Sequence, residues 1–444
     1  MKIINRISKL LFFATILISF QSFAQEMKTL SLEQCLQIGL QNSKQINASL
    51  MKVKVARAQA KQVGASRFFS LNLGATYTRL SQVPPFSVNT PFGNFVISPS
   101  IFDNYNMNIS LQQPLFTGFK LANSYDAAKL NASAVEQDYT QAEQDLFLNI
   151  KNAYWGLFKA IQIKKVVDED VQTVKAHLED VQNFFKQGLA TQNDVLKVQV
   201  QLSQVQLQQI DASNGVKLAM LNLNNVIGLP LSTDIVPNDS VSVNDQNNTT
   251  NKSLDELVSE AMKNRPELKA MKLRVDASDK NVAVAQGDWY PQLFVAGEYD
   301  YAKPNQRLLP TQNKFYGTWN VSLGLSYNLW NWGATADKTQ EAEANLAQAQ
   351  DNYKLLNDAV QLDVNQNYFN FVKARLKVMV SRQTVKQAEE NYRVTDEKFK
   401  QGLTLNSELL DAEVALAQAR TDYVQAQVDY ELSLAKLDRA IGIK

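Results

Sequence analysis

The sequence predicts a mainly α protein with a transmembrane β section, built from two tandem repeats of helix, strand, strand, long helix and helix. Three observations predict this fold. The second half of the chain matches the first in register, each half contains two stretches of alternating apolar and polar residues, and each half contains a long proline-free segment with helical periodicity. The repeats cover residues 25–228 and 253–444.

Composition limits the classes of function. The chain has 444 residues, 20% of them charged, and a formal net charge of +1, so nucleic acid is a poor candidate partner. One cysteine, Cys35, and one histidine, His177, exclude internal disulfides, common zinc sites and most histidine-based catalysis. We therefore expect no enzyme, no cofactor and no metal. We place Cys35 at a buried position of the first helix and His177 at a solvated position of a long helix.

Residues 1–24 have the pattern of a secretory signal peptide. Lys2, Arg6 and Lys9 precede a short apolar run over 10–20, and Ser22-Phe23-Ala24 is a small-x-small cleavage sequence. The mature chain is therefore expected to begin at residue 25 and to leave the cytoplasm.

The two repeats align with two different offsets. A shift of 222 residues superimposes their opening helices and first strands, and a shift of 214 superimposes Phe185-Lys186-Gln187-Gly188-Leu189 on Phe399-Lys400-Gln401-Gly402-Leu403. The difference, 222 minus 214, leaves eight extra residues in the first copy between Arg79 and Asn104. Four prolines there predict an irregular loop. Residues 229–252, rich in Asp, Asn, Ser and Thr, form the expected linker between the repeats.

Each repeat opens with a helical pattern and continues with two strands. The opening helices are expected over 31–66 and 253–287, where Ser31 and Ser253 stand before acidic residues as N-caps. The hydrophobic period then changes to two, as in Leu71, Leu73 and Tyr77. The four expected strands lie at about 68–79, 104–115, 290–302 and 316–329. About ten residues is the length that a tilted strand needs to cross a bilayer.

A long helix and a second helix complete each repeat. The long helices are expected over about 118–187 and 333–400, and each would measure about 100 Å. Glycines at 188 and 402 are expected to end them. The second helices follow over 191–227 and 405–441. Apolar seams on the long helices predict helix-on-helix packing in an extended assembly.

Aromatic residues gather at the expected strands. At strand ends they are typical of the girdles of membrane barrels, although each could also be an ordinary sheet-core residue. The girdle candidates are Tyr77, Tyr105, Trp289, Tyr299, Trp319, Tyr327 and Trp330. Four strands cannot close a barrel, and an open edge cannot face lipid, so several chains must share one barrel. Strand arithmetic alone does not fix their number.

The order of elements resembles the TolC-like outer membrane efflux family over nearly the whole mature chain. The resemblance is carried by the Ser-Leu-Glu/Asp opening of each copy, by the strand exits Pro114-Leu115-Phe116 and Asn328-Leu329-Trp330, and by the two glycine sequences aligned above. It implies a homotrimer whose 12-stranded β-barrel lies in the outer membrane and continues into a periplasmic α-helical barrel. Such a trimer is the exit duct of a tripartite efflux or type I secretion system. Drugs, metal ions and polypeptides all remain possible substrates.

The resemblance also implies partners for the turns between the helices. Conduction would be passive and energised by an inner-membrane pump that docks through a periplasmic adaptor. Adaptors of this family meet the tips of the helical hairpins, which here are Gly188, Leu189, Ala190, Thr191, Gly402, Leu403 and Thr404. The alternative is that both glycines only end helices.

Acidic residues just past the tips are candidates for a periplasmic constriction. They are Asp194, Glu408 and Asp411, and the resemblance implies that Glu408 and Asp411 match acidic positions of the family's constriction. Glu408 and Asp411 share a helical face at i,i+3, so a trimer could collect six carboxylates around one opening that favours cations. The alternative is that Asp194 and Glu408 are first-turn acids, with Thr191 to Asp194 as a capping box.

One feature departs from the family. Better-known members hold the entrance closed with a Tyr and an Arg near the tip, and the matching residues here are Phe399 and Thr404. Neither can form that polar contact, so closure is expected to rest on apolar packing of Phe185 and Phe399 or on other bonds.

Two other classes of protein compete with an exit duct. A periplasmic coiled-coil adaptor or structural protein would explain the helices but not four alternating strands. A secreted enzyme would require a catalytic constellation, and the sequence contains no phosphate-binding loop and no nucleophile paired with a base.

Overall fold

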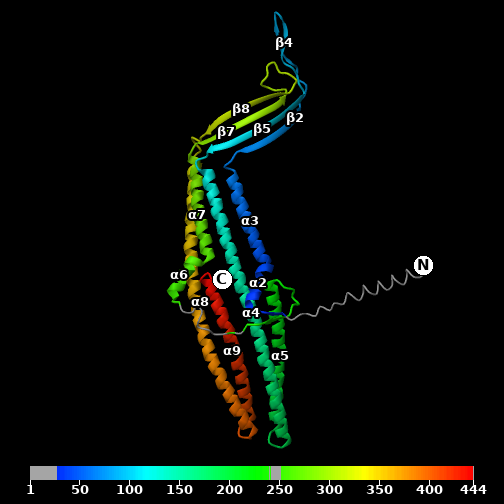
Figure 1. Ribbon diagram of the computed structural model, residues 1–444, viewed down its shortest axis with the longest axis vertical. Coiled ribbons are helices and arrows are strands. Elements are labelled where there is room, and N and C mark those ends of the chain that lie inside the picture. Colours follow the sequence, from blue (N-terminus) through cyan, green and yellow to red (C-terminus); the bar gives the residue numbers. More distant parts are fainter. Residues whose placement is uncertain (1–27, 240, 242–251, 444) are drawn as a thin grey trace, which may run out of the picture. The chain divides into compact units, whose positions relative to one another are not determined.

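The computed structural model describes residues 28–239, 241 and 252–443 (Figure 1). The expected signal peptide and part of the expected linker, residues 240 and 242–251, lie outside the described residues. The described chain divides into two compact units. The first, which we call the tip unit, takes its residues from 1–47, 141–265 and 359–444, and the second, the sheet unit, comprises 48–140 and 266–358.

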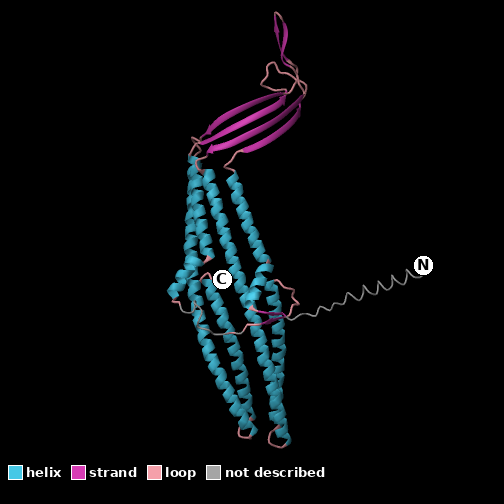
Figure 2. Ribbon diagram, in the orientation of Figure 1, coloured by secondary structure: helices cyan, strands magenta, loops and turns pink. Residues whose placement is uncertain are grey.

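The order of elements confirms the predicted fold class, and helices dominate both units (Figure 2). The long helices are α4 (Lys120–Lys186) and α8 (Ala334–Lys400), followed by α5 (Gln192–Ile227) and α9 (Asn406–Ala440). No helix of the described chain is apolar over a stretch long enough to cross a membrane. Long helices of mixed polarity are typical of helices that pack on one another.

The opening helices differ from the prediction because each is broken in two. The first copy has α2 (Leu32–Asn42) and α3 (Lys44–Ala65), and the second has α6 (Leu254–Asn264) and α7 (Pro266–Gln286). Ser43 and Arg265 adopt extended backbone conformations at the breaks. A proline disfavours helical geometry in the residue before it, which explains the break at Arg265.

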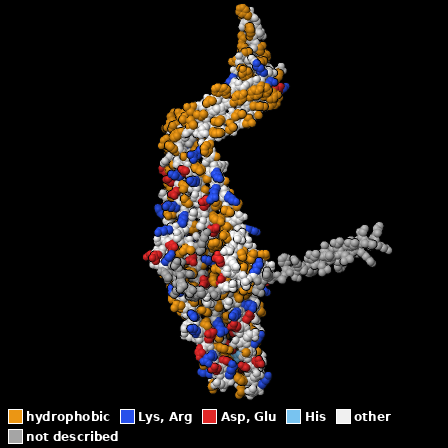
Figure 3. Space-filling model, viewed as in Figure 1, with side chains coloured by type: hydrophobic (Ala, Val, Ile, Leu, Met, Phe, Trp, Pro, Cys, Tyr) orange, Lys and Arg blue, Asp and Glu red, His pale blue; other side chains and the backbone are white. Residues whose placement is uncertain are grey.

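The sheet unit holds one antiparallel sheet in the order β2 (Ser70–Arg79), β5 (Asp103–Phe116), β7 (Gln292–Lys303) and β8 (Tyr316–Ser326). The pairing of β5 with β7 joins the two repeats. Because the strands pair odd with odd positions through most of their length, one face is apolar and the other polar. Hydrophobic side chains gather over the strands (Figure 3). Within the described chain the outer edges of β2 and β8 have no partner.

The expected loop between the first two strands contains a hairpin instead. It consists of β3 (Phe86–Thr90) and β4 (Gly93–Ser98), and every residue of both strands is exposed. The four prolines lie before, between and after the paired strands, so none of them removes a ladder hydrogen bond. The prediction of an irregular loop was therefore wrong for the centre of this segment.

A short parallel pair, β1 (Lys28–Leu30) with β6 (Ile235–Pro237), connects the start of the first repeat with the residues that follow α5. Cys35 is fully buried beside this pair, as predicted, and burial raises the pKa of its thiol to about 11. Three-residue strands carry too little periodicity to be predicted from sequence.

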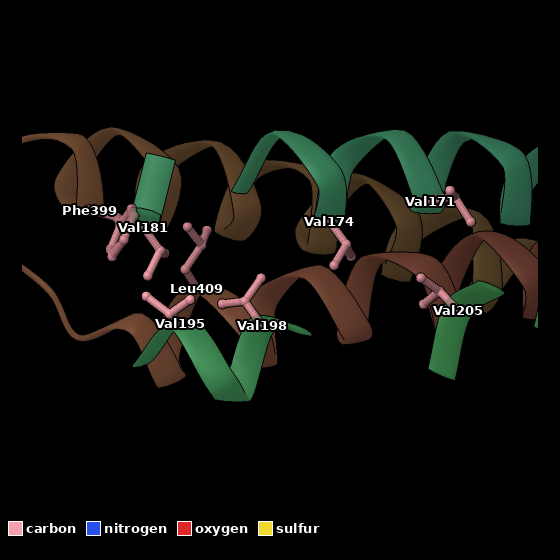
Figure 4. Packing of buried hydrophobic residues seen from close by; sticks show 8 residues of the cluster. All are labelled: Val171, Val174, Val181, Val195, Val198, Val205, Phe399 and Leu409. Carbon is pink, nitrogen blue, oxygen red and sulfur yellow. The ribbon is translucent and has the colours of Figure 1, made fainter. Parts of the chain in front are cut away.

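Four helices supply the core at the glycine end of the tip unit (Figure 4). Its eight buried residues are Val171, Val174, Val181, Val195, Val198, Val205, Phe399 and Leu409. The first three come from α4, the next three from α5, and the last two from α8 and α9. The two helical hairpins therefore pack as one body at this end, which positions the turns described next.

Candidate functional site

Two turns of nearly identical geometry connect α4 to α5 and α8 to α9. Gly188 and Gly402 have backbone φ angles of +76° and +71°. The Leu189 N–H donates to the Phe184 carbonyl, and the Leu403 N–H donates to the Lys398 carbonyl, each over 2.8 Å. These are Schellman motifs, so both glycines do end helices. Among the described residues, apart from its own neighbours in the chain, nothing lies within 4 Å of a Cβ built on either glycine, so the side-chain space at both turns is open.

Large apolar side chains surround the two glycines. Leu189 and Leu403 are 72% and 71% exposed, and Leu405 and Phe185 are also exposed. Ala190 differs because it is half-buried and packs against the core of the tip unit. Each turn therefore presents an exposed leucine directly after its glycine, and in the first turn the next residue, Ala190, packs against the core.

The helix that follows each turn begins differently. The Thr191 N–H donates to Asp194 Oδ2 over 3.0 Å and the Asp194 N–H donates to Thr191 Oγ1 over 3.2 Å, which is the predicted capping box. Hydrogen bonds from Thr191 hold the pKa of Asp194 below its usual value. In contrast, α9 has no side-chain cap, and the Thr404 hydroxyl donates to Glu408.

Glu408 and Asp411 lie on the solvent face of α9, one turn apart. Both are exposed, whereas Leu409 and Ala412, the residues that follow them, are buried. Asp194 is half-buried, and its carbonyl accepts from Asn406 Nδ2 over 3.4 Å. Glu408 and Asp411 thus share one exposed face of α9, whereas the Asp194 carboxylate caps the start of α5.

Phe185 and Phe399, the residues whose apolar packing is expected to close the entrance, have different surroundings within one chain. Phe399 is buried and contacts Phe184 and His177, with ring centroids 5.5 and 5.2 Å away, whereas Phe185 is exposed. Neighbouring helical residues point about 100° apart, so only one of the two adjacent phenylalanines can face the core. Within one chain, Phe184 is therefore the aromatic partner of Phe399.

His177 is buried, and the prediction of a solvated position was wrong. Its Nδ1 lies 3.1 Å from Glu413 Oε2, and the two side chains are 2% and 1% exposed. The sequence contained the evidence for burial, because Val174, His177 and Val181 follow the i, i+3, i+7 spacing of a buried helical face.

A second polar group of α4, the Asp170 carboxyl, is also affected by burial. Burial, aided by the charge of Glu413, raises the pKa of Asp170 to about 6.

The aromatic residues of the sheet unit lie at three levels of the strands. Tyr77 pairs with Tyr105 near one end of β2 and β5, with their rings 5.0 Å apart. Tyr299 pairs with Trp319 nearer the middle of the sheet, in the register row of Ile109. Trp289, Tyr327 and Trp330 stand at the other end, before β7 and after β8. Sequence reasoning missed a further cluster at this second end, where Phe116, Phe119 and Tyr290 meet edge to face. All the girdle candidates except Tyr105 are exposed.

Comparison with known proteins decides the family. The family model described as "Outer membrane efflux protein" matches residues 35–229 and 257–443, which is most of the chain. The chain belongs to this family. This outer membrane efflux protein is accordingly a channel protein of the outer membrane with a periplasmic helical part, as the resemblance predicted.

Individual relatives agree with the family. The efflux protein is 24% identical over 416 residues to the alkaline protease secretion protein AprF of Pseudomonas aeruginosa, which covers 91% of this chain and 83% of AprF. It is 24% identical over 347 residues to the outer membrane protein TolC of Vibrio cholerae, covering 78% of each. Both similarities cover more than three quarters of this chain.

Solved structures share the fold at lower identity. The outer membrane protein VceC of Vibrio cholerae superimposes with a TM-score of 0.79 at 19% identity, covering 93% of this chain and 96% of VceC. CusC gives a TM-score of 0.79 at 15% identity, and the match covers 96% of both chains.

In the described part of the efflux protein, no group of three His, Cys, Asp or Glu residues is placed to hold a metal ion.

Proposed function

We propose that three copies of this protein form a homotrimeric exit duct whose shared barrel crosses the outer membrane. The observation that carries the proposal is the four-stranded sheet with one apolar face, one polar face and two unpaired edges. In lipid every backbone polar group needs a partner, so the β8 edge of one copy must pair with the β2 edge of the next. Three copies give twelve strands, enough to enclose a water-filled lumen.

The two glycine turns are the proposed docking points for a periplasmic adaptor. Leu189 and Leu403 are exposed apolar side chains on backbone turns that are rigidly closed by Schellman hydrogen bonds. Exposed apolar side chains around an open backbone suit a protein partner whose own apolar residues cover them. The adaptor would connect the duct to an inner-membrane pump, which supplies the energy, so the chain itself needs no catalytic activity.

Glu408 and Asp411 are proposed to form an acidic constriction at the periplasmic opening. Their support is their exposure on one face of α9, with the neighbouring Leu409 and Ala412 turned into the core. Threefold symmetry would place six carboxylates around the axis and attract cations. For Asp194, the capping box with Thr191 supports the alternative of a helix-start residue.

The cargo is proposed only as a class. Among the relatives, AprF is named as a protease secretion protein and BepC of Brucella suis as an efflux protein. Export of polypeptides by a type I secretion system and efflux of small molecules are therefore both open for this chain, and the inner-membrane pump would select between them.

A size measurement and an ion-flux measurement together test the proposal. Protein extracted from membranes in detergent is expected to have three times the mass of the mature chain by native mass spectrometry and to pass ions in a planar bilayer. A water-soluble monomer that passes no ions would overturn it. Copurification of an inner-membrane transporter and its adaptor would identify the cargo class.

A further inference from the structure

The polar face of the sheet carries charge at only two positions. On the described strands β2, β5, β7 and β8, the residues of this face are mostly Asn, Ser, Thr, Gln, Gly and Ala. The two charged residues are Glu298 and Asp300, both acidic and both on β7. The other charged side chains of the four strands, Arg79, Asp103 and Lys303, stand on the apolar face.

Neighbouring strands hold the carboxylate of Glu298 from both sides. Asn108 of β5 donates through Nδ2 to Glu298 Oε1 over 3.3 Å, and Asn320 of β8 donates through Nδ2 to Oε2 over 3.4 Å. Both donors are neutral amides, so they orient the carboxylate without cancelling its charge.

Strand β2 leaves room for the Asn108 side chain in this arrangement. Gly74 of β2 pairs with Asn108, and a Cβ at Gly74 would lie 2.4 Å from Asn108 Oδ1. A glycine at this position therefore allows Asn108 to take the conformation that reaches Glu298. On its other side, Asn108 pairs directly with Asp300. All four strands thus contribute polar residues to two adjacent register rows, which we together call the sheet row.

Both carboxylates remain accessible to an ion. Glu298 and Asp300 are half-buried, and neither makes an ion pair with a lysine or arginine of the described chain. A fixed carboxylate without a counter-ion on an otherwise neutral polar face sets the sign of the local potential. The nearest alternative is that the row only stabilises the sheet by hydrogen bonding, which would not depend on charge.

We propose that Glu298 and Asp300 are the cation-selecting residues of the sheet section of the duct. The inference rests on the proposed function, because it requires that the polar face line a shared lumen. Three copies would then contribute six carboxylates at two adjacent levels of the sheet, in addition to the six proposed at Glu408 and Asp411. Inorganic cations and cationic groups of a passing substrate would be favoured over anions.

The test is the potassium-to-chloride permeability ratio, measured from reversal potentials of the full-length protein in planar bilayers under a KCl gradient. Glu298→Gln with Asp300→Asn is expected to lower the ratio at least threefold, with a larger effect at 0.1 M than at 1 M salt because of screening. The matched control is Asp103→Asn, which removes one carboxylate from the opposite face and should leave the ratio unchanged.

A second variant guards against loss of folding in the first. Thr76→Lys adds a positive charge to the polar face of β2 without touching Glu298, and should also lower the ratio. Conducting variants with an unchanged ratio would overturn this inference and leave the exit duct standing. A wild-type protein that passes no ions would overturn the exit duct and this inference with it.

Discussion

His177 Nδ1 lies 3.1 Å from Glu413 Oε2, and this pair connects α4 to α9 inside the core of the tip unit. Phe399 packs edge to face on the imidazole, and His177 Nε2 has no hydrogen-bond partner among the described residues. Two polar groups with almost no solvent access depend on each other, because neither can be hydrated once the other is removed.

Replacing one residue of this pair should lower the free energy of unfolding more than replacing both. We expect Glu413→Leu or His177→Leu alone to lower the free energy of unfolding by about 3 kcal/mol, because the remaining group stays buried without its partner. The double variant should regain most of this loss, since apolar residues then fill the same space. Denaturant titrations of the purified protein, followed by circular dichroism, measure all three.

The control is an exposed ion pair of the same unit. Arg393 contacts Glu390 over 2.7 Å with both side chains more than half exposed. Arg393→Gln should cost less than about 1 kcal/mol. Single variants of His177 and Glu413 that are no more destabilised than Arg393→Gln would contradict the assignment of a buried, mutually dependent pair.

Asp170 should make the tip unit less stable at higher pH. Burial and the charge of Glu413 raise the pKa of this carboxyl to about 6, while the charge of Arg420 opposes the shift. A pKa raised on folding stabilises the folded state below the unfolded value, near pH 4, and this contribution is lost as the pH rises through 6. Asp170→Asn should therefore raise the melting temperature at pH 8 and leave it nearly unchanged at pH 4.

The matched comparison for Asp170 is Asp168, two residues earlier on the same helix. Hydrogen bonds from Gln209 and Lys164 lower the pKa of Asp168, so its contribution has the opposite sign: it is present above the unfolded pKa and lost as the pH falls. Asp168→Asn should therefore lower the melting temperature at pH 8. Equal shifts for the two variants would argue against the burial of Asp170.

The elements that were predictable from sequence are those with a long, regular hydrophobic period. The paired glycines at 188 and 402, the alternation through Leu71 and Leu73, and the proline-free long helices correspond to α4, α8 and the strands of the sheet. The prediction for His177 was wrong because it rested on the polarity of a lone histidine. The spacing of this residue from Val174 and Val181 places it on the buried face of the helix.

Contacts between distant segments were beyond the reach of sequence periodicity. Nothing in the alternation of β5 and β7 shows that these two strands pair with each other across the repeats. The same holds for Asn108 and Glu298, which are brought together only by that pairing. A pattern along one chain fixes which face a side chain occupies, but the register between strands fixes what it meets.

Two substitutions of Gly402 should distinguish its role in folding from its role in export. A Cβ at Gly402 meets no atom within 4 Å, so the cost of Gly402→Ala is the positive φ angle alone, about 1 kcal/mol. Gly402→Leu has a similar backbone cost but adds bulk at the proposed adaptor contact. We expect both variants to form trimers and only the leucine variant to lose export, measured as substrate accumulation in cells that carry the matching pump.

Gly188 provides the internal comparison, because its φ angle and open surroundings match those of Gly402. If both turns contact the adaptor, Gly188→Leu should also reduce export. Loss of trimers from the membrane in the leucine variants would leave the glycines with a structural role alone and would remove these turns from the proposed interface.

The acidic pair on α9 should control current independently of the carboxylates of the sheet. Glu408→Gln with Asp411→Asn is expected to raise single-channel conductance or to reduce cation preference, because a ring of charge at a narrow opening dominates the local field.

Thr191→Ala is the control at the neighbouring turn. It removes the cap that holds Asp194, so it should lower the stability by about 1 kcal/mol and leave the current unchanged. The α9 pair belongs to the tip unit and the sheet row to the sheet unit. If the two act independently, their effects on the permeability ratio should multiply when both are neutralised. Unchanged currents in the α9 variant would exclude Glu408 and Asp411 from the constriction, and the sheet row would then account for any cation preference that remains.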